Sequence, residues 1–309
     1  MATIRRAVID VGTNSIKLLV ADVSDGTVQP VLEDSEQTRL GAGFFEGNRL
    51  QPQAVEQSAR AVAVFADKAR ELSAVSTRVI ATSAARDAIN SADLTSAIER
   101  AAGLKVEIIS GDHEADLAFQ GVKTDLELAE RPLLLLDIGG GSTEFILGKG
   151  EHKQFRRSFQ LGTVRLLEKS PPDDPPTSAQ LAACREFVKD FLQREVRPQL
   201  EPLLKQHAAQ LIGTGGTATI LARMEHRLTE YDRARIEGTR LSLAQIRAQV
   251  ERLWGLPLAE RKMIAGLPKT RADVILYGVV IYEGVMENLG FSELRISTRG
   301  LRFAAVMGG

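Results

Sequence analysis

The chain lacks two features that mark common classes of protein: pairs of cysteines, as in disulfide-bonded proteins, and long apolar segments, as in membrane proteins. It contains one cysteine in 309 residues, so no internal disulfide can form, and Cys184 lies in an apolar helical pattern typical of a small buried side chain. No apolar segment is long enough for a signal peptide or a membrane-spanning helix. We therefore expect a cytoplasmic protein without a membrane partner.

An excess of charge of either sign is also missing. Lysine plus arginine number 39 and aspartate plus glutamate number 40, for a net charge of −1. This balance excludes the basic surface that would coat nucleic acid or an anionic membrane. An anionic ligand must therefore be bound by a local cluster of arginine, lysine and backbone amides. The length predicts about two domains, and 44% hydrophobic residues are enough for a core in each.

Two short stretches of the sequence are nearly the same. Residues 8–15 read VIDVGTNS and residues 135–143 read LLDIGGGST, so each is an apolar strand that ends in Asp, followed by Gly and by hydroxyl or amide side chains. Such a turn presents backbone N–H groups to phosphate, while Asp10 or Asp137 faces a cation. The predicted phosphate-binding residues of the two loops are Gly12, Thr13, Asn14, Ser15, Gly139, Gly140, Gly141, Ser142 and Thr143.

Strand and helix patterns alternate along both halves of the chain. The first half reads β-β-β-α-β-α-β-α, over 4–10, 16–22, 27–33, 52–72, 78–82, 94–102, 105–110 and a helix that begins near Asp112. The second half repeats the three strands at 133–137, 143–147 and 153–160, and continues with helices over 178–192, 242–254, 257–264 and 272–288 and a last strand over 294–297. The proline-rich segment 170–176 is predicted to be an exposed loop. The repeated loops lie about one domain length apart, which predicts two related domains facing each other across a cleft.

Four motifs in order resemble one family. They are IDVGTNS at 9–15, IISGDHEA at 108–115, LDIGGGSTE at 136–144 and GTGGT at 213–217. Together they resemble the exopolyphosphatase and guanosine pentaphosphate phosphatase (Ppx/GppA) family of the actin, sugar-kinase and chaperone ATPase superfamily. The resemblance covers essentially the whole chain and implies an α/β fold of two ribonuclease-H-like domains. It implies a first domain over 1–130, rejoined by 298–309, a second over 131–297, and a homodimer of the short form.

The chemistry of phosphoanhydride hydrolysis requires a carboxylate near the phosphate loops, because an attacking water needs a base or a positioning group. Glu114 follows a predicted strand and lies in the first turn of a helix. From the residues alone, it is either this base or a carboxylate that stabilises the helix start. The family resemblance implies that Glu114 activates water and that Glu144 holds the water or a metal ion. The alternative for Glu144 is an exposed carboxylate on a strand.

A divalent cation is the predicted cofactor. Asp10 and Asp137 end their strands at the phosphates, where Mg²⁺ with mostly water ligands is expected, and Glu144 is a third candidate ligand. The alternative for the two aspartates is that they accept backbone N–H groups and shape the loops.

Arginines are expected to complete the phosphate clamp. Arg86 in TSAARDA and Arg39 in TRLG match patterns of the family, although Arg39 could equally be an exposed arginine. Arg165 and Arg271, the latter with Asp273, match further motifs and are either ligands or parts of an ion-paired scaffold. A third glycine-rich turn, predicted to approach the nucleotide or substrate closely, contains Gly213, Gly215, Gly216 and Thr217.

Two functions of different classes remain from the sequence. The first is a hydrolase that removes terminal orthophosphate from inorganic polyphosphate, with guanosine pentaphosphate (pppGpp) as an alternative substrate. The second is a regulator that binds polyphosphate or a nucleotide without turnover. Both carboxylates and both loops are present, which favours the enzyme, because a binding protein has no use for a water-activating carboxylate. Two departures from the family pattern, His113 beside Glu114 and Phe303 near the end, leave this machinery in place.

Overall fold

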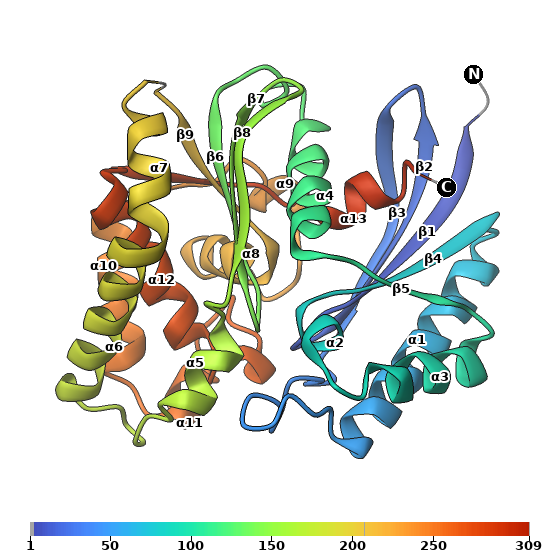
Figure 1. The fold of residues 1–309 in the computed structure, drawn as a ribbon, viewed down its shortest axis with the longest axis horizontal. Coiled ribbons are helices and arrows are strands. Elements are labelled where there is room, and N and C mark those ends of the chain that lie inside the picture. Colours follow the sequence, from blue (N-terminus) through green and yellow to red (C-terminus); the bar gives the residue numbers. More distant parts are fainter. Residues whose placement is uncertain (1–2, 207, 309) are drawn as a thin grey trace.

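Two mixed β-sheets stand side by side in the computed structural model, which describes residues 3–206 and 208–308 (Figure 1). The first sheet has the strand order β3-β2-β1-β4-β5. Its strands are β1 (Ile4–Val11), β2 (Ile16–Ser24), β3 (Thr27–Glu36), β4 (Ser76–Ala81) and β5 (Val106–Ile108). The helices that follow these strands are α1 (Pro52–Glu71), α2 (Ser83–Asp87), α3 (Ser91–Ala102) and α4 (Gly111–Lys123).

The second sheet has the order β10-β11-β9-β6-β7-β8. Its strands are β6 (Leu133–Ile138), β7 (Thr143–Lys149), β8 (His152–Phe159), β9 (Gln210–Thr214), β10 (Arg240–Ser242) and β11 (Glu293–Ile296). Its helices are α5 (Thr163–Lys169), α6 (Ser178–Phe191), η1 (Leu192–Val196), α7 (Arg197–Leu204), α8 (Gly215–Glu225), α9 (Arg233–Ile236), α10 (Leu243–Trp254), α11 (Leu258–Arg261), η2 (Lys269–Arg271) and α12 (Ile275–Leu289), and the last helix of the chain is α13 (Leu301–Ala305).

The two sheets share one plan, which confirms the predicted pair of ribonuclease-H-like units. In each, the first strand lies in the middle, antiparallel to the second strand and parallel to the fourth. The second and third strands form the antiparallel meander that the sequence predicts in both halves. As a result β1 and β6, which carry the two Asp-Gly loops, occupy equivalent central positions.

Burial explains the sequence pattern of the central elements. Leu133 to Leu136 in β6 are all fully buried, because helices cover both faces of this sheet, so the strand reads as a continuous apolar run. Helix α12 is largely apolar because most of it is buried in the core of the second half, and it ends at Gly290, whose φ of +78° suits a left-handed helix cap. Cys184 is half-buried against this core, in line with a packing role.

Two helices each pack on the sheet of the other half of the chain. Apolar residues of α4, among them Phe119 and Val122, pack against β6, β7 and β9 of the second sheet. Helix α13 packs with Leu301 and Phe303 on the first sheet, against β1, β2 and β4 (Figure 1). The predicted domain bounds stay a prediction, although the packing of Leu301 to Met307 on the first sheet is in line with the predicted return of the C-terminal segment.

Further contacts join the two halves on the loop side. Residues 38–50 reach toward α5, where Glu168 accepts N–H bonds from Gly43 at 2.6 Å and Phe45 at 3.3 Å. The ring of Phe45 also stacks under the Arg165 guanidinium, 4.3 Å from it. Arg39 forms an ion pair with Asp273 at 2.7 Å. The halves are therefore tied by polar contacts on this side and by apolar packing of α4 and α13 on the other.

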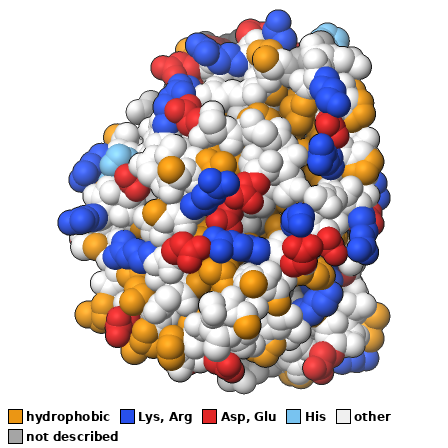
Figure 2. All heavy atoms as spheres, turned by 90° about the vertical axis from the view of Figure 1, so that its left-hand side faces the viewer, with side chains coloured by type: hydrophobic (Ala, Val, Ile, Leu, Met, Phe, Trp, Pro, Cys, Tyr) orange, Lys and Arg blue, Asp and Glu red, His pale blue; other side chains and the backbone are white. Residues whose placement is uncertain are grey.

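The surface fits the balanced composition. Acidic and basic side chains are interspersed over the face drawn in Figure 2, so binding of an anion must depend on a local site. Among the described residues, no helix has the length and apolar character required to cross a membrane.

Candidate active site between the two sheets

A cavity lies where the loops after β1 and β6 meet. We call it the small cavity. Its volume is about 80 Å³, which corresponds to two or three water molecules at about 30 Å³ each. It is lined by residues of both halves, including Asp10, Thr13, Asn14, Ser15, Ser83, Glu114, Asp137, Gly140, Gly141, Ser142, Glu144, Gly216 and Thr217. The two loops, both candidate glutamates and the third glycine-rich turn therefore meet at one point.

The two loops have the same local geometry. The Gly12 N–H donates to the Ser15 carbonyl at 3.1 Å, and the Gly139 N–H donates to the Ser142 carbonyl at 2.9 Å. The loops also touch, because a Cβ placed on Gly140 or Gly141 would lie 3.0 Å from the Thr13 side chain. Any larger residue at these two positions would fill the space between the loops, which explains the glycines there.

Several hydrogen-bond donors in this cavity have no acceptor within the part of the chain that the structure describes. They are the N–H groups of Thr13, Asn14, Gly140 and Gly141. The Asn14 amide nitrogen and the Ser83 hydroxyl are also buried without a partner. Because a buried polar group without a partner costs free energy, these groups indicate an absent ligand that accepts hydrogen bonds. A phosphoryl group meets that requirement.

The two glutamates are held by different partners. Glu114, in the first turn of α4, accepts a hydrogen bond from Arg86 at 2.8 Å, and its side chain is 14% exposed. Glu144 lies on β7 opposite Asp137 and is 2% exposed. Its Oε1 atom accepts from the hydroxyls of Ser142 and Ser158, each at 2.7 Å. The carboxylates are therefore fixed on one wall of the cavity.

Burial changes the pKa values of both glutamates. Burial, and then the charge of Glu144, raise the pKa of Glu114 well above its usual value, although Arg86 opposes the change. Burial, and then the charge of Asp137, raise the pKa of Glu144 to about 7. A carboxyl group whose pKa lies near neutrality is suited to accept a proton from water.

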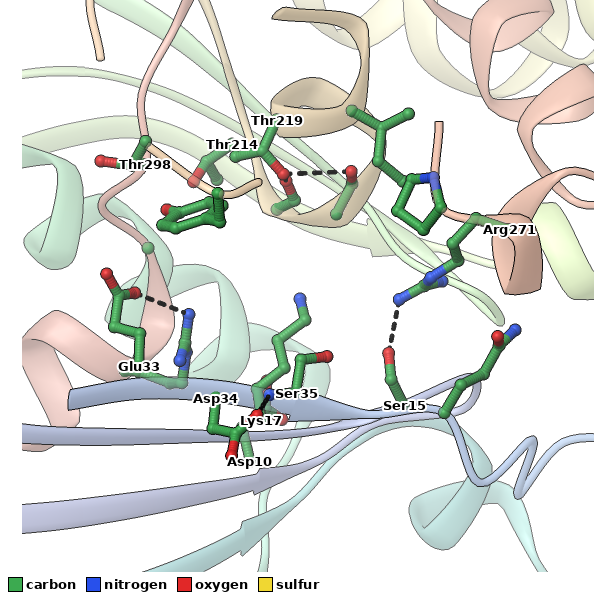
Figure 3. A pocket seen from close by; sticks show the side chains of 18 of the residues that line it. Asp10, Ser15, Lys17, Glu33, Asp34, Ser35, Thr214, Thr219, Arg271 and Thr298 are labelled. Carbon is green, nitrogen blue, oxygen red and sulfur yellow. Dashed lines mark hydrogen bonds and ion pairs between the residues drawn. The ribbon is translucent and has the colours of Figure 1, made fainter. Parts of the chain in front are cut away.

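Lys17 is a site residue that the sequence did not single out. It extends from β2 into the large cavity between the two halves (Figure 3), and its positive charge lowers the pKa of Asp10 and Asp137. Burial has the larger effect and raises the pKa of both aspartates, while it lowers the pKa of Lys17. Lys17 therefore lines the same cavity as the two aspartates that were predicted to face Mg²⁺.

The donor set limits how a metal ion could be held. The described residues contain no group of three His, Cys, Asp or Glu side chains that could hold an ion together, so Asp10, Asp137 and Glu144 do not form a joint three-ligand site. Asp10 and Asp137 both line the small cavity. They fit a hard cation that takes most of its ligands from water and substrate.

A larger cavity of about 410 Å³ opens beside the first, and we call it the large cavity. The two cavities share Asp10, Ser15, Lys17, Asp137, Gly216, Arg271 and Leu301. Arg271 reaches across from the second half and donates a hydrogen bond to the Ser15 hydroxyl (Figure 3). Burial lowers the pKa of Arg271 to about 10, so it remains charged at neutral pH. Glu114 and Glu144 do not line the large cavity.

Some predicted site residues do not line the small cavity. The Thr143 side chain is fully buried and its hydroxyl donates to the Leu161 carbonyl, so Thr143 supports the loop from behind. Gly213 lies against the ring of Tyr282, away from both cavities, while Gly215 lines the large one. Arg39 is half exposed in its ion pair with Asp273, where it joins the two halves.

Arg86 and Arg165 also have structural partners. Arg86 does not line the small cavity, and it contacts the site through Glu114. Arg165 donates to the Gly141 carbonyl at 2.9 Å and lies 3.7 Å from Asp87, as a scaffold residue would.

Ser83 and Ser158 are further site residues that sequence reasoning missed. Ser83 is part of the TSAARDA motif, so its neighbour Arg86 was a signal for it. Ser158 reaches Glu144 because β8 pairs with β7 in the register that sets these two residues opposite each other. That register could not be predicted from the local sequence.

Comparisons with known proteins agree with this geometry. The Ppx/GppA phosphatase family profile matches residues 19–307. The chain is 34% identical over 313 aligned positions to exopolyphosphatase 2 of Mycobacterium tuberculosis, with 96% of each sequence covered. Its fold is similar to the PPX-GPPA enzyme of Aquifex aeolicus (TM-score 0.80, 30% identity, 100% of both chains). It is also similar to an exopolyphosphatase from Cytophaga hutchinsonii (TM-score 0.86, 27% identity, 97% and 96% of the chains).

Proposed function

The chain belongs to the Ppx/GppA phosphatase family, and from this premise we propose that it is an exopolyphosphatase that releases terminal orthophosphate from inorganic polyphosphate. The observation that carries the proposal is the small cavity. It offers unpaired N–H donors and two carboxylates in a volume of about 80 Å³, which has room for one phosphoryl group and a water. A terminal phosphoryl group suits this volume, which supports cleavage at the end of a chain.

The residues suggest how hydrolysis proceeds. The two loops hold the terminal phosphoryl group, and Glu114 takes a proton from the water that Glu144 helps to position. The oxygen of this water bonds to phosphorus as the bridging P–O bond breaks. Lys17 and Arg271, which line both cavities, stabilise the charge that develops on the departing chain. Bound Mg²⁺, near Asp10 and Asp137, would screen phosphate charge further.

A second substrate class has support from the large cavity. Tyr231, Ile220 and Pro268 provide apolar surface there that suits a nucleobase. These features favour a nucleoside oligophosphate such as pppGpp as the alternative substrate.

Phosphate release from four substrates tests the proposal. Short polyphosphate, long polyphosphate, pppGpp and ATP are compared, each with and without Mg²⁺. We expect release from polyphosphate to exceed release from ATP. Faster release from pppGpp than from either polyphosphate would assign the alternative substrate, and tight polyphosphate binding with no release from any of the four would identify a regulator.

The activity should also depend on pH. We expect kcat/KM for polyphosphate to rise with pH at a higher pH than an ordinary glutamate would give, because Glu114 acts in its ionised form and burial and the charge of Glu144 raise its pKa. A glutamate with an ordinary pKa of about 4.3 would complete the rise by about pH 5. Glu144→Gln removes a charge that raises the pKa of Glu114, so it should move the rise to lower pH. A wild-type profile whose rise is complete by about pH 5 would contradict this mechanism.

A further inference from the structure

A third cavity lies on the far side of the two glutamates, and we call it the side cavity. Its volume is about 370 Å³. Six of its lining residues matter here: Arg86, Ser110, Ser142, Arg157, Ser158 and Gln160. Ser142 also lines the small cavity, whereas the side cavity and the large cavity share no lining residue. The small cavity therefore lies between the other two.

The order of the cavities fixes the direction of the reaction, if the proposed function holds. In-line attack requires the water and the departing chain on opposite sides of phosphorus. Glu114 and Glu144 line the small cavity and not the large one, so the water attacks from their side. The remaining chain must then extend into the large cavity. The new orthophosphate is left between that chain and the glutamate wall.

Two side-chain hydrogen bonds cross the wall between the small cavity and the side cavity. Arg86 faces the side cavity and holds Glu114, which lines the small cavity, at 2.8 Å. Ser158 faces the side cavity and donates to Glu144 at 2.7 Å. Because Arg86 and Ser158 hold the two glutamates through side-chain hydrogen bonds, a connection between the cavities opens when these bonds break and the side chains rotate.

The side cavity suits an anion. Arg157 has no carboxylate partner among the described residues, and its guanidinium donates to the Gln199 amide oxygen at 3.0 Å. Of the two acidic residues that line the cavity, Asp87 lies 3.6 Å from Arg86 and Asp112 lies 3.9 Å from Arg156. Hydroxyl groups of Ser110 and Ser158 complete the polar lining.

We propose that the side cavity is an exit port through which orthophosphate leaves while the shortened polyphosphate stays in the large cavity. This inference rests on the proposed function. Its consequence is processive cleavage, because the product does not have to pass the chain. The port takes an inorganic oxyanion, and it shares no lining residue with the large cavity that holds the chain.

The first test narrows the port at its mouth. Gln160 is exposed just after β8, and Gln160→Trp adds bulk there, whereas the matched Gln154→Trp adds the same bulk to an exposed position of β8 that lines none of the three cavities. Hydrolysis is run in water labelled with heavy oxygen. Each cleavage places one labelled oxygen in the product. A trapped phosphate can re-form the bond by losing water and be cleaved again, which adds a second label.

We expect Gln160→Trp to increase the share of doubly labelled phosphate about twofold or more and to slow turnover, because product release becomes limiting. It should also change cleavage of long polyphosphate from processive to distributive, seen as a ladder of intermediate lengths on a gel. Label content and chain-length distribution equal to those of Gln154→Trp would overturn the exit port.

A charge reversal provides a second test that does not depend on bulk. Arg157→Glu places a negative charge at the mouth, and Arg194→Glu reverses an exposed charge on η1 as its control. Release of orthophosphate after a single turnover should be about threefold or more slower in Arg157→Glu, because the departing anion must pass a negative charge at the mouth. Equal release rates in both variants would argue against the port. If the wild-type protein releases no phosphate from polyphosphate, the proposed function fails instead.

Discussion

Glu114→Gln is expected to reduce phosphate release from polyphosphate by about 10²- to 10⁴-fold, the usual contribution of a general base. The amide keeps the shape of the side chain, and its oxygen can still accept the hydrogen bond from Arg86 that holds Glu114 at 2.8 Å. It cannot take a proton from water. Polyphosphate binding should therefore stay nearly unchanged, because the N–H donors of the two loops are intact. Steady-state phosphate release and a binding titration measure the two effects separately.

Glu107→Gln is the matched control. Glu107 lies on β5 close in sequence, but its side chain is half exposed and bonded to Arg78. It should behave as the wild type. If Glu114→Gln releases phosphate at the wild-type rate, the base is another group and the proposed mechanism is wrong. A loss of binding that equals the loss of turnover would instead assign Glu114 to substrate binding.

Gly121→Ala is expected to have the largest effect on the fold. A Cβ on Gly121 would lie 1.9 Å from the carbonyl oxygen of Gly300 and 2.6 Å from its carbonyl carbon. Both are backbone atoms, so α4 and the segment before α13 must move apart by about 1 Å or more in a densely packed interior. Overpacking of this kind costs about 1–3 kcal/mol or more in the free energy of unfolding. Urea denaturation measures the cost.

The same substitution should reduce activity, because α4 carries Glu114 and Leu301 of α13 lines the small cavity. A displacement of about 1 Å in a catalytic group can lower the rate about 10²-fold. Gly47→Ala is the control, since a Cβ there meets no atom within 4 Å. Wild-type stability in Gly121→Ala would show that the two helices do not cross as tightly as described.

Local pattern predicted much of the fold. The strands of both meanders, the helices from Pro52 and Ser178, and the exposed proline-rich loop all follow from periodicity, and the structure confirms them. Short elements were missed, among them α2, α5, α9, β10 and α13, because a few residues carry too little periodic signal to be told from a loop. The ends of several elements differ by a few residues for the same reason. The helix predicted to end at residue 192 continues through η1 and α7 to Leu204.

The candidate site was predictable where a motif is contiguous. Both loops lie in short runs whose composition points to phosphate chemistry, whereas Glu114 was singled out by a motif of the family. The structure brings all three into one cavity. Arg39 fits a family pattern equally well, yet it pairs with Asp273 from the distant second half. A pattern in one segment cannot reveal the partner that another segment supplies.

By itself, the sequence determined the fold class, the repeated loops and the family, because these depend on periodicity and on short contiguous motifs. Only the tertiary structure decided that α4 covers the opposite sheet. It also decided that Lys17 lines both cavities beside the Asp-Gly loops, and that Ser158 faces Glu144. Such contacts join residues that are far apart in the chain, and strand register and helix packing set them. The order of the three cavities, and with it the direction of the proposed reaction, follows from that packing alone.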